Sequence, residues 1–170
     1  DVYKRQLHDP VMDTDLVLTY SVYEDYPVIT RSARLVQKGD QKIRLENVMS
    51  AAVEFPDMDY EMIHLSGAWA RERYVKTRKL EMGIQAVQSL AGTGSSSEQN
   101  PFIALKRPHT TEDTGEVFGF SFVYSGNFLA QVEVSTYEMT RVMMGINPQG
   151  FSWELSRDEE FQTPEVVMVY

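Results

Sequence analysis

Alternation of apolar and polar residues is the main pattern along this chain. Between residues 16 and 22 the larger apolar side chains recur at every second position, which is typical of a strand with one buried face. No segment keeps a helical period over three turns. We therefore expect strands over residues 16–22, 28–36, 42–55, 74–80, 84–90, 102–106, 116–124, 128–135, 141–146, 151–155 and 166–170.

Short turn motifs separate these segments. Residues 26–27 (YP) and 38–40 (KGD) punctuate the first strands and predict an early meander. Residues 81–83 (EMG) and 125–127 (SGN) are interpreted as hairpin connections between the strands on either side of them. Strands of this number, joined by short turns, predict an all-β fold, an antiparallel β-sandwich.

Residues 91–98 (AGTGSSSE) form the one low-complexity segment. Its glycine and serine content predicts a mobile loop. A phosphate-binding loop is not expected, because no Gly-Lys-Ser/Thr follows and no helical pattern begins after it.

Composition narrows the class of protein. The chain has 170 residues, of which 42% are hydrophobic and 11% aromatic, as expected for one globular unit. Sixteen basic and 25 acidic residues give a net charge of −9, which disfavours nucleic acid and membrane surfaces as partners. The absence of cysteine rules out disulfides and thiolate chemistry and favours a reducing compartment, so we expect a cytoplasmic location.

Both ends of the sequence look interrupted. Residues 1–6 (DVYKRQ) match the translation of a transposase adapter used in sequencing libraries, and we interpret them as a scar. Residues 167–170 (VMVY) end inside an apolar run without a turn residue. We therefore expect residues 7–170 to be one partial β-sandwich domain, truncated at both ends.

The sequence contains no recognisable catalytic constellation. His8, His64 and His109 are scattered without metal-ligand spacing, so no metal site is expected. The serine nucleophile motif Gly-x-Ser-x-Gly is absent. Neighbouring carboxylates are expected to be solvated loop residues, because unpaired charge stays in water; they occur at residues 24–25, 57–61, 112–113 and 158–160.

One short motif has the chemistry of a ligand site. Residues 67–69 (GAW) lead into residues 71–73 (RER). Small residues allow close approach of a ligand, an indole offers a flat apolar face with one N–H donor, and arginine adds a fork of donors. A sugar ring, with an apolar C–H face and a rim of hydroxyls, suits this set. The alternative is that Trp69 is a core residue and residues 71–73 form a surface ion-pair cluster.

Several longer motifs, in order, resemble the N-terminal domain of glycoside hydrolase family 36 α-galactosidases. The resemblance runs from about Leu16 to Tyr170. It is carried by residues 28–34 (VITRSAR), 64–73 (HLSGAWARER), 99–105 (QNPFIAL), 115–134 (GEVFGFSFVYSGNFLAQVEV), 144–148 (MGINP) and 161–170 (FQTPEVVMVY).

The resemblance implies part of a β-supersandwich, followed in the complete protein by a (β/α)8 barrel. That barrel would carry the aspartate nucleophile and the aspartate acid/base of a retaining mechanism, so no catalytic residue is expected in this chain and the chain alone should be inactive. Trp69 matches the tryptophan of the family's GAW motif and is expected to bind substrate. The resemblance further implies terminal α-galactosides such as melibiose and raffinose as substrates, no cofactor, and a homo-oligomer, a tetramer.

Two loops depart from the family pattern. Residues 90–97 lack the family's arginine pair and histidine, and Asn147-Pro148 is followed by Gln149-Gly150 where Phe-Asp is usual. No role is carried over to these loops. Two alternatives to the enzyme-domain interpretation stay open: a stand-alone carbohydrate-binding β-sandwich that uses Trp69, and an oligomerisation domain with Trp69 in its core.

Overall fold

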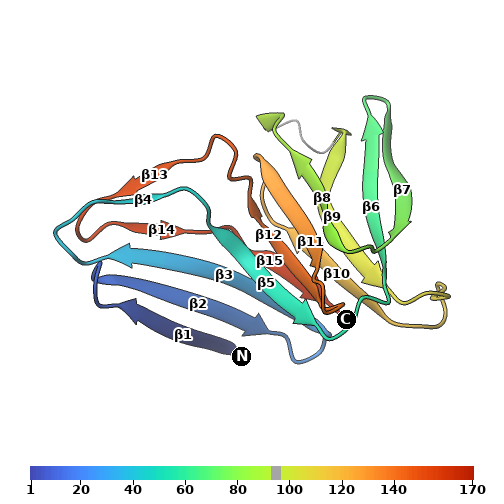
Figure 1. Cartoon of the computed structure of the whole chain (residues 1–170), viewed down its shortest axis with the longest axis horizontal. Coiled ribbons are helices and arrows are strands. Elements are labelled where there is room, and N and C mark those ends of the chain that lie inside the picture. The colour runs from blue at the N-terminus through green and yellow to red at the C-terminus, as the bar shows by residue number, and fades with distance from the viewer. Residues whose placement is uncertain (93–96) are drawn as a thin grey trace.

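The fold is built from antiparallel strands, as predicted. The computed structural model describes residues 1–92 and 97–170, and the regular elements within these ranges are 15 strands (Figure 1). The larger sheet has nine strands. Eight follow one another in the order β1 (Val2–Asp9), β2 (Thr14–Val22), β3 (Val28–Gln37), β15 (Val166–Val169), β10 (Val117–Phe122), β9 (Gln99–Lys106), β6 (Glu61–Ala68) and β7 (Arg71–Lys79), while β14 (Glu160–Gln162) also pairs with β3.

A second, smaller sheet packs on the first and makes the sandwich. Its order is β5 (Met49–Phe55), β12 (Thr140–Ile146), β11 (Phe128–Val134) and β8 (Gly83–Ser89). A two-stranded ribbon of β13 (Trp153–Leu155) and β4 (Ile43–Leu45) lies near β14 and β3 at one end (Figure 1). The all-β, antiparallel sandwich expected from the sequence is confirmed.

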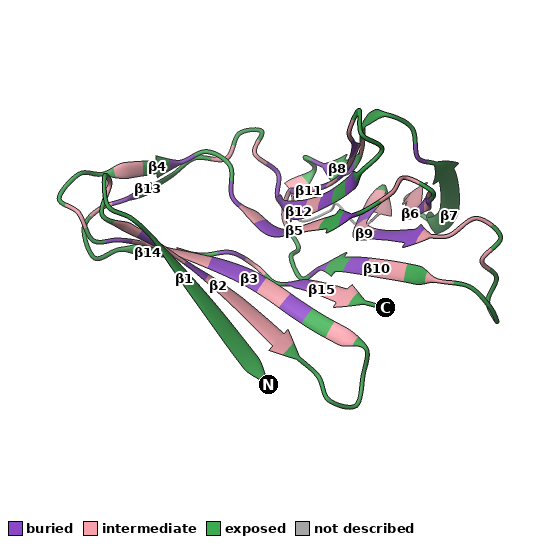
Figure 2. Cartoon of the chain, turned by 60° about the horizontal axis from the view of Figure 1, so that its bottom comes forward, coloured by how far each residue is buried: buried purple, intermediate pink, exposed green. Residues whose placement is uncertain are grey.

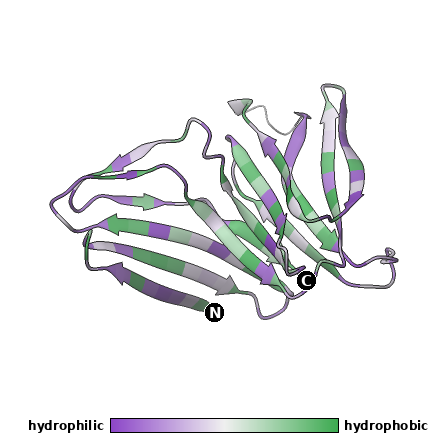
Figure 3. Cartoon of the chain, in the orientation of Figure 1, coloured by the Kyte–Doolittle hydropathy of each residue, from purple (hydrophilic) through white to green (hydrophobic). Residues whose placement is uncertain are grey.

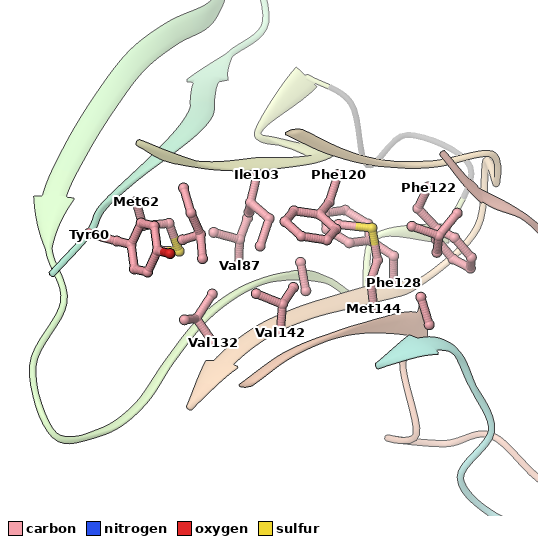
Figure 4. Packing of buried hydrophobic residues seen from close by; sticks show 14 of the residues in the cluster. Tyr60, Met62, Val87, Ile103, Phe120, Phe122, Phe128, Val132, Val142 and Met144 are labelled. Atoms are coloured by element: carbon pink, nitrogen blue, oxygen red, sulfur yellow. The ribbon is translucent and has the colours of Figure 1, made fainter. Parts of the chain in front are cut away.

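The core lies between the two sheets. Along β11 the residues alternate between buried and half-buried, so one face of the strand is turned inward, as the period of two requires. In Figure 4, Ile103 and Phe120 of the larger sheet face Phe128 and Met144 of the smaller one. Hydropathy follows the same division, because the central strands are largely hydrophobic and β7 is largely hydrophilic (Figure 3).

Two predicted hairpins are wrong, because their turns carry the chain from one sheet to the other. Residues 81–83 join β7, which pairs with β6, to β8, which pairs with β11. Residues 125–127 join β10 of the larger sheet to β11 of the smaller one. In both cases the strands lie in different layers. Alternation shows only that each strand has one buried face, which is true of both arrangements.

The expected early meander is confirmed only in part. Strands β2 and β3 form an antiparallel pair, with residues 23–27 between them. After residues 38–40 the chain leaves the sheet, since β4 pairs with β13 and β5 joins the smaller sheet. The buried Gln37 stabilises this exit: its side-chain oxygen accepts a bond from the Thr14 hydroxyl and its amide donates to the carbonyl of Gln41.

Strand β1 contains residues 2–6, which the sequence interpretation assigned to a scar. All eight residues of β1 are exposed, and the strand pairs with β2 at the edge of the larger sheet (Figure 2). The scar assignment stays a prediction. Strands β6 and β14 were not predicted as strands. The loop expected over residues 91–98 falls in part on residues 93–96, outside the described ranges.

Candidate functional site

The GAW motif ends a two-stranded hairpin at the edge of the larger sheet. Strands β6 and β7 pair from Glu61 with Lys79 to Ala68 with Arg71. Trp69 and Ala70 form the connection, and Ala70 has a positive φ of 63°. The Trp69 side chain is 87% exposed. Trp69 therefore does not lie in the core of this chain, and the alternative that placed it there is wrong.

Gly67 allows the two strands to approach closely beside Trp69. The pairing register shifts between Ser66 and Ala68, and the amide of Gly67 donates to the carbonyl of Glu98 at 2.9 Å. A Cβ atom on Gly67 would lie 2.3 Å from the carbonyl oxygen of Arg71. Because that oxygen belongs to the backbone of the facing strand, a side chain here would force the hairpin apart.

We expect Gly67→Ala to destabilise the chain by about 1–3 kcal/mol, the usual cost of overpacking a well-packed position. Thermal unfolding of the purified chain measures this as a fall of several degrees. Gly119→Ala in β10 is the matched control, since its Cβ would meet its nearest neighbours at 3.9 Å. Equal melting temperatures for the two variants would contradict the close approach at Gly67.

A polar groove lies along the hairpin next to this turn. It has a volume of about 320 Å³ and is lined by Ser66, Gly67, Arg71, Tyr74, Lys76 and Gln99. The register explains how the groove forms, because Ser66 lies opposite both Tyr74 of β7 and Gln99 of β9. Tyr74 is 56% exposed. The lining therefore contains donors, acceptors and an aromatic ring, but no carboxylate.

His64 lies in β6, two residues before Ser66, and its side chain is buried. Nη2 of Arg78 is 2.8 Å from Nε2 of His64. Arginine can only donate, so Nε2 accepts and the proton of the neutral ring lies on Nδ1. Burial lowers the pKa of His64, Arg78 lowers it further, and Gln99 acts in the opposite direction. Burial and the bond from Arg78 thus favour the neutral form of the ring.

The predicted carboxylate cluster at residues 57–61 is largely ion-paired rather than simply solvated. Arg107 binds Asp57 through two nitrogens, at 2.6 and 3.1 Å, and Glu116 at 3.0 Å. The guanidinium also lies over the ring of Tyr60, 4.0 Å from its centroid. Arg107 lowers the pKa of Asp57. These contacts tie the segment before β6 to β9 and β10, which is a structural role.

Other polar groups form no recognisable reaction centre. Asp15 is buried and is bound by His8, Gln6 and Lys38. Lys38 is the largest cause of its lowered pKa. Within residues 1–92 and 97–170, no three histidine or acidic side chains are grouped so that they could hold a metal ion. The same ranges contain no helix with the length and apolarity needed to cross a bilayer.

The exposed ring and the groove at this hairpin have the chemistry to contact a polar ligand, and the two carboxylates of the hairpin, Glu61 and Glu72, do not line the groove. An exposed indole at a fixed turn provides a flat apolar surface, and the adjoining groove provides neutral and cationic hydrogen-bonding groups. Cleavage of a glycosidic bond usually needs two carboxyl groups, and none lines the groove. The described residues thus form a β-sandwich with an exposed tryptophan and a polar groove at one hairpin.

The chain belongs to the glycosyl hydrolase family 36 N-terminal domain family, whose sequence model matches residues 2–156. It is 53% identical over 164 residues to alpha-galactosidase AgaA of Geobacillus stearothermophilus, covering 96% of this chain and 22% of that enzyme. The crystal structure of AgaA superposes with a TM-score of 0.97 at 51% identity, over 99% of this chain and 23% of that one. Alpha-galactosidase 1 of Pediococcus pentosaceus is 43% identical over 164 residues, which are 96% of this chain and 22% of that enzyme.

The chain thus spans about a fifth of the length of these relatives. Variants of AgaA have been crystallised with stachyose and with raffinose. Sequence reasoning singled out Gly67, Trp69 and Arg71 on one polar, arginine-rich segment; Gly67 and Arg71 line the groove, whereas Trp69 does not. It missed Tyr74 and Gln99, which are 25 positions apart and meet only through the register of β6 with its two neighbours.

Proposed function

We propose that this chain is part of the N-terminal domain of a retaining α-galactosidase, which hydrolyses terminal α-linked galactose from oligosaccharides such as melibiose and raffinose. The observation that carries the proposal is the match to α-galactosidases over 96% of the chain at up to 53% identity. The nucleophile and the acid/base would be aspartates in the larger part of the enzyme, outside residues 1–170. This domain would help to shape the galactose pocket.

Trp69 is the residue of this chain that would contact galactose. Its ring is exposed on a hairpin that is paired along its length. A ligand can therefore contact the indole without any rearrangement of the core. The apolar C–H face of a sugar stacks on such a ring. Trp69 would position the substrate and take no part in proton transfer.

We further propose that the complete enzyme is a homo-oligomer, a tetramer, acts in the cytoplasm, and needs no metal or organic cofactor. An apolar groove of about 560 Å³ supports association. Both sheets contribute to it, with Val53 and Phe55 on one side and Phe118, Phe120 and Met168 on the other. Open apolar surface of this kind is usually covered in an assembled protein. The lack of cysteine fits a reducing compartment.

A stand-alone carbohydrate-binding module is the second candidate. The exposed Trp69 beside a polar groove favours it, because such a surface could hold a saccharide without any catalytic partner. The two candidates differ in whether this chain can complete an active enzyme.

A chimera separates them. The 164 residues of AgaA that align with this chain are replaced by the corresponding residues of this chain. We expect the chimera to fold and to hydrolyse raffinose at a rate within about one order of magnitude of that of AgaA, because the backbones of the two segments superpose closely. AgaA and an AgaA variant lacking the segment are the controls. A folded chimera without α-galactosidase activity would contradict the proposed function and favour a binding module.

A further inference from the structure

We infer that the polar groove along β6, β7 and β9 binds the hydroxyl groups of the sugar unit that is linked to the terminal galactose. This inference rests on the proposed function, in which Trp69 contacts the terminal galactose. The groove is lined by residues of the hairpin and of β9, and Trp69 is not among them. A ligand that contacts both would therefore place two different parts of itself at the two positions.

The placement of the residues gives the groove a direction. Arg71 lies directly after the Trp69-Ala70 connection, and Tyr74 and Lys76 follow along β7. The groove therefore begins at the turn that carries Trp69 and runs away from that turn along the hairpin. An oligosaccharide whose terminal ring rests on Trp69 would continue into the groove with its next unit.

The lining suits a neutral ligand with many hydroxyl groups. Ser66 and Tyr74 have hydroxyls that can both donate and accept, Arg71 and Lys76 donate, and Gln99 has an amide. The half-exposed Tyr74 ring offers an apolar face beside these groups. A volume of about 320 Å³ falls at the lower end of the range for small-ligand sites, about 300–1,000 Å³. Its polar lining is unusual for such sites and disfavours an apolar ligand.

His64 and Arg78 favour one orientation of the Gln99 amide. Oε1 of Gln99 and Nδ1 of His64 are both buried and have no well-formed hydrogen bond. Because Arg78 donates to Nε2 of His64, Nδ1 carries the proton and can only donate, while the Gln99 oxygen can only accept. The amide nitrogen of Gln99 is then the atom left to donate to a ligand.

The test uses the active chimera and two substrates. Tyr74→Phe removes one hydroxyl, and Gln99→Leu removes the amide. Each should lower kcat/KM for raffinose about 3- to 10-fold, the range expected for one hydrogen bond of about 0.7–1.4 kcal/mol. For an aryl α-galactoside, whose leaving group has no sugar hydroxyls, the change should stay below about 2-fold.

Lysine gives a matched pair of variants on one strand. Lys76 lines the groove, whereas Lys79 lies on the opposite face of β7 and is also exposed. Lys76→Met should lower kcat/KM for raffinose, and Lys79→Met should leave it unchanged. Inorganic phosphate should not inhibit the chimera. Inhibition that is lost in Lys76→Met would overturn the inference in favour of an anion site.

The outcomes for the groove and for Trp69 can be told apart. Equal losses on both substrates, or no loss on either, would overturn the groove inference even if Trp69→Ala behaves as expected. If Trp69→Ala has no effect while the groove variants lose activity on raffinose alone, the role of Trp69 is wrong and the groove stands. Should the chimera be folded but inactive, calorimetric titration replaces turnover: Tyr74→Phe must weaken raffinose binding more than galactose binding, and equal weakening or none overturns the inference.

Discussion

The purified 170-residue chain is expected to give no hydrolysis of a chromogenic α-galactoside above that of a blank. Retaining glycosidases use two carboxyl groups about 5–5.5 Å apart, one as nucleophile and one as acid and base. The groove beside Trp69 has no carboxylate in its lining. Binding without a nucleophile cannot supply the covalent route, so the expected effect is complete loss relative to the active chimera.

Two cavities elsewhere each contain two carboxylates, and in each an arginine binds one of the two; in one of them Arg34 binds Glu160, while Glu165 lines the same cavity. Glu54 and Glu133 line the other cavity together with Arg141, and two guanidinium nitrogens of Arg141 bind Glu54. A mock purification from the same host is the control for contaminating enzyme. Turnover that exceeds this control and is lost in Glu133→Gln would show a catalytic pair in this chain.

The pattern of apolar positions predicted the fold class because burial of one strand face leaves a local trace. Phe128, Ala130, Val132 and Val134 recur with a period of two and are all buried. The partner of each strand leaves no such trace. Residues 125–127 have the composition of a hairpin turn, yet they join two layers. Which layer a strand enters depends on contacts that are distant in sequence, and a turn motif does not record them.

Strand β7 shows a second limit of prediction from apolar alternation. All nine of its residues are exposed, so it has no buried face, and its place in the sheet comes from backbone pairing with β6. The sequence placed Trp69 correctly on a polar segment, because residues 71–73 are charged and no apolar alternation surrounds them. It did not show that Trp69 ends a hairpin. Nor did it show the groove, which depends on register between separate strands.

Trp69→Ala in the active chimera is expected to lower kcat/KM roughly 5- to 150-fold. Loss of an aromatic platform removes apolar contact and ring stacking worth roughly 1–3 kcal/mol, and about 1.4 kcal/mol corresponds to one factor of ten. The loss should appear with raffinose and with an aryl α-galactoside alike, because both present the same terminal galactose. Trp69→Phe, which keeps a ring, should recover part of the activity.

Stability distinguishes this role from a structural one. Trp69 is 87% exposed in this chain, so its removal should lower the melting temperature by a few degrees at most, whereas a tryptophan buried in a core costs about 3–5 kcal/mol. Trp153 is the control: it is 50% exposed, lies in β13, and its ring centroid is 5.5 Å from that of Phe161. Trp153→Ala should lose some stability from that ring contact while kcat/KM stays near that of the chimera. If Trp69→Ala instead gives a large fall in melting temperature with near-normal kcat/KM in the folded enzyme, Trp69 packs against the rest of the protein and is not a substrate contact.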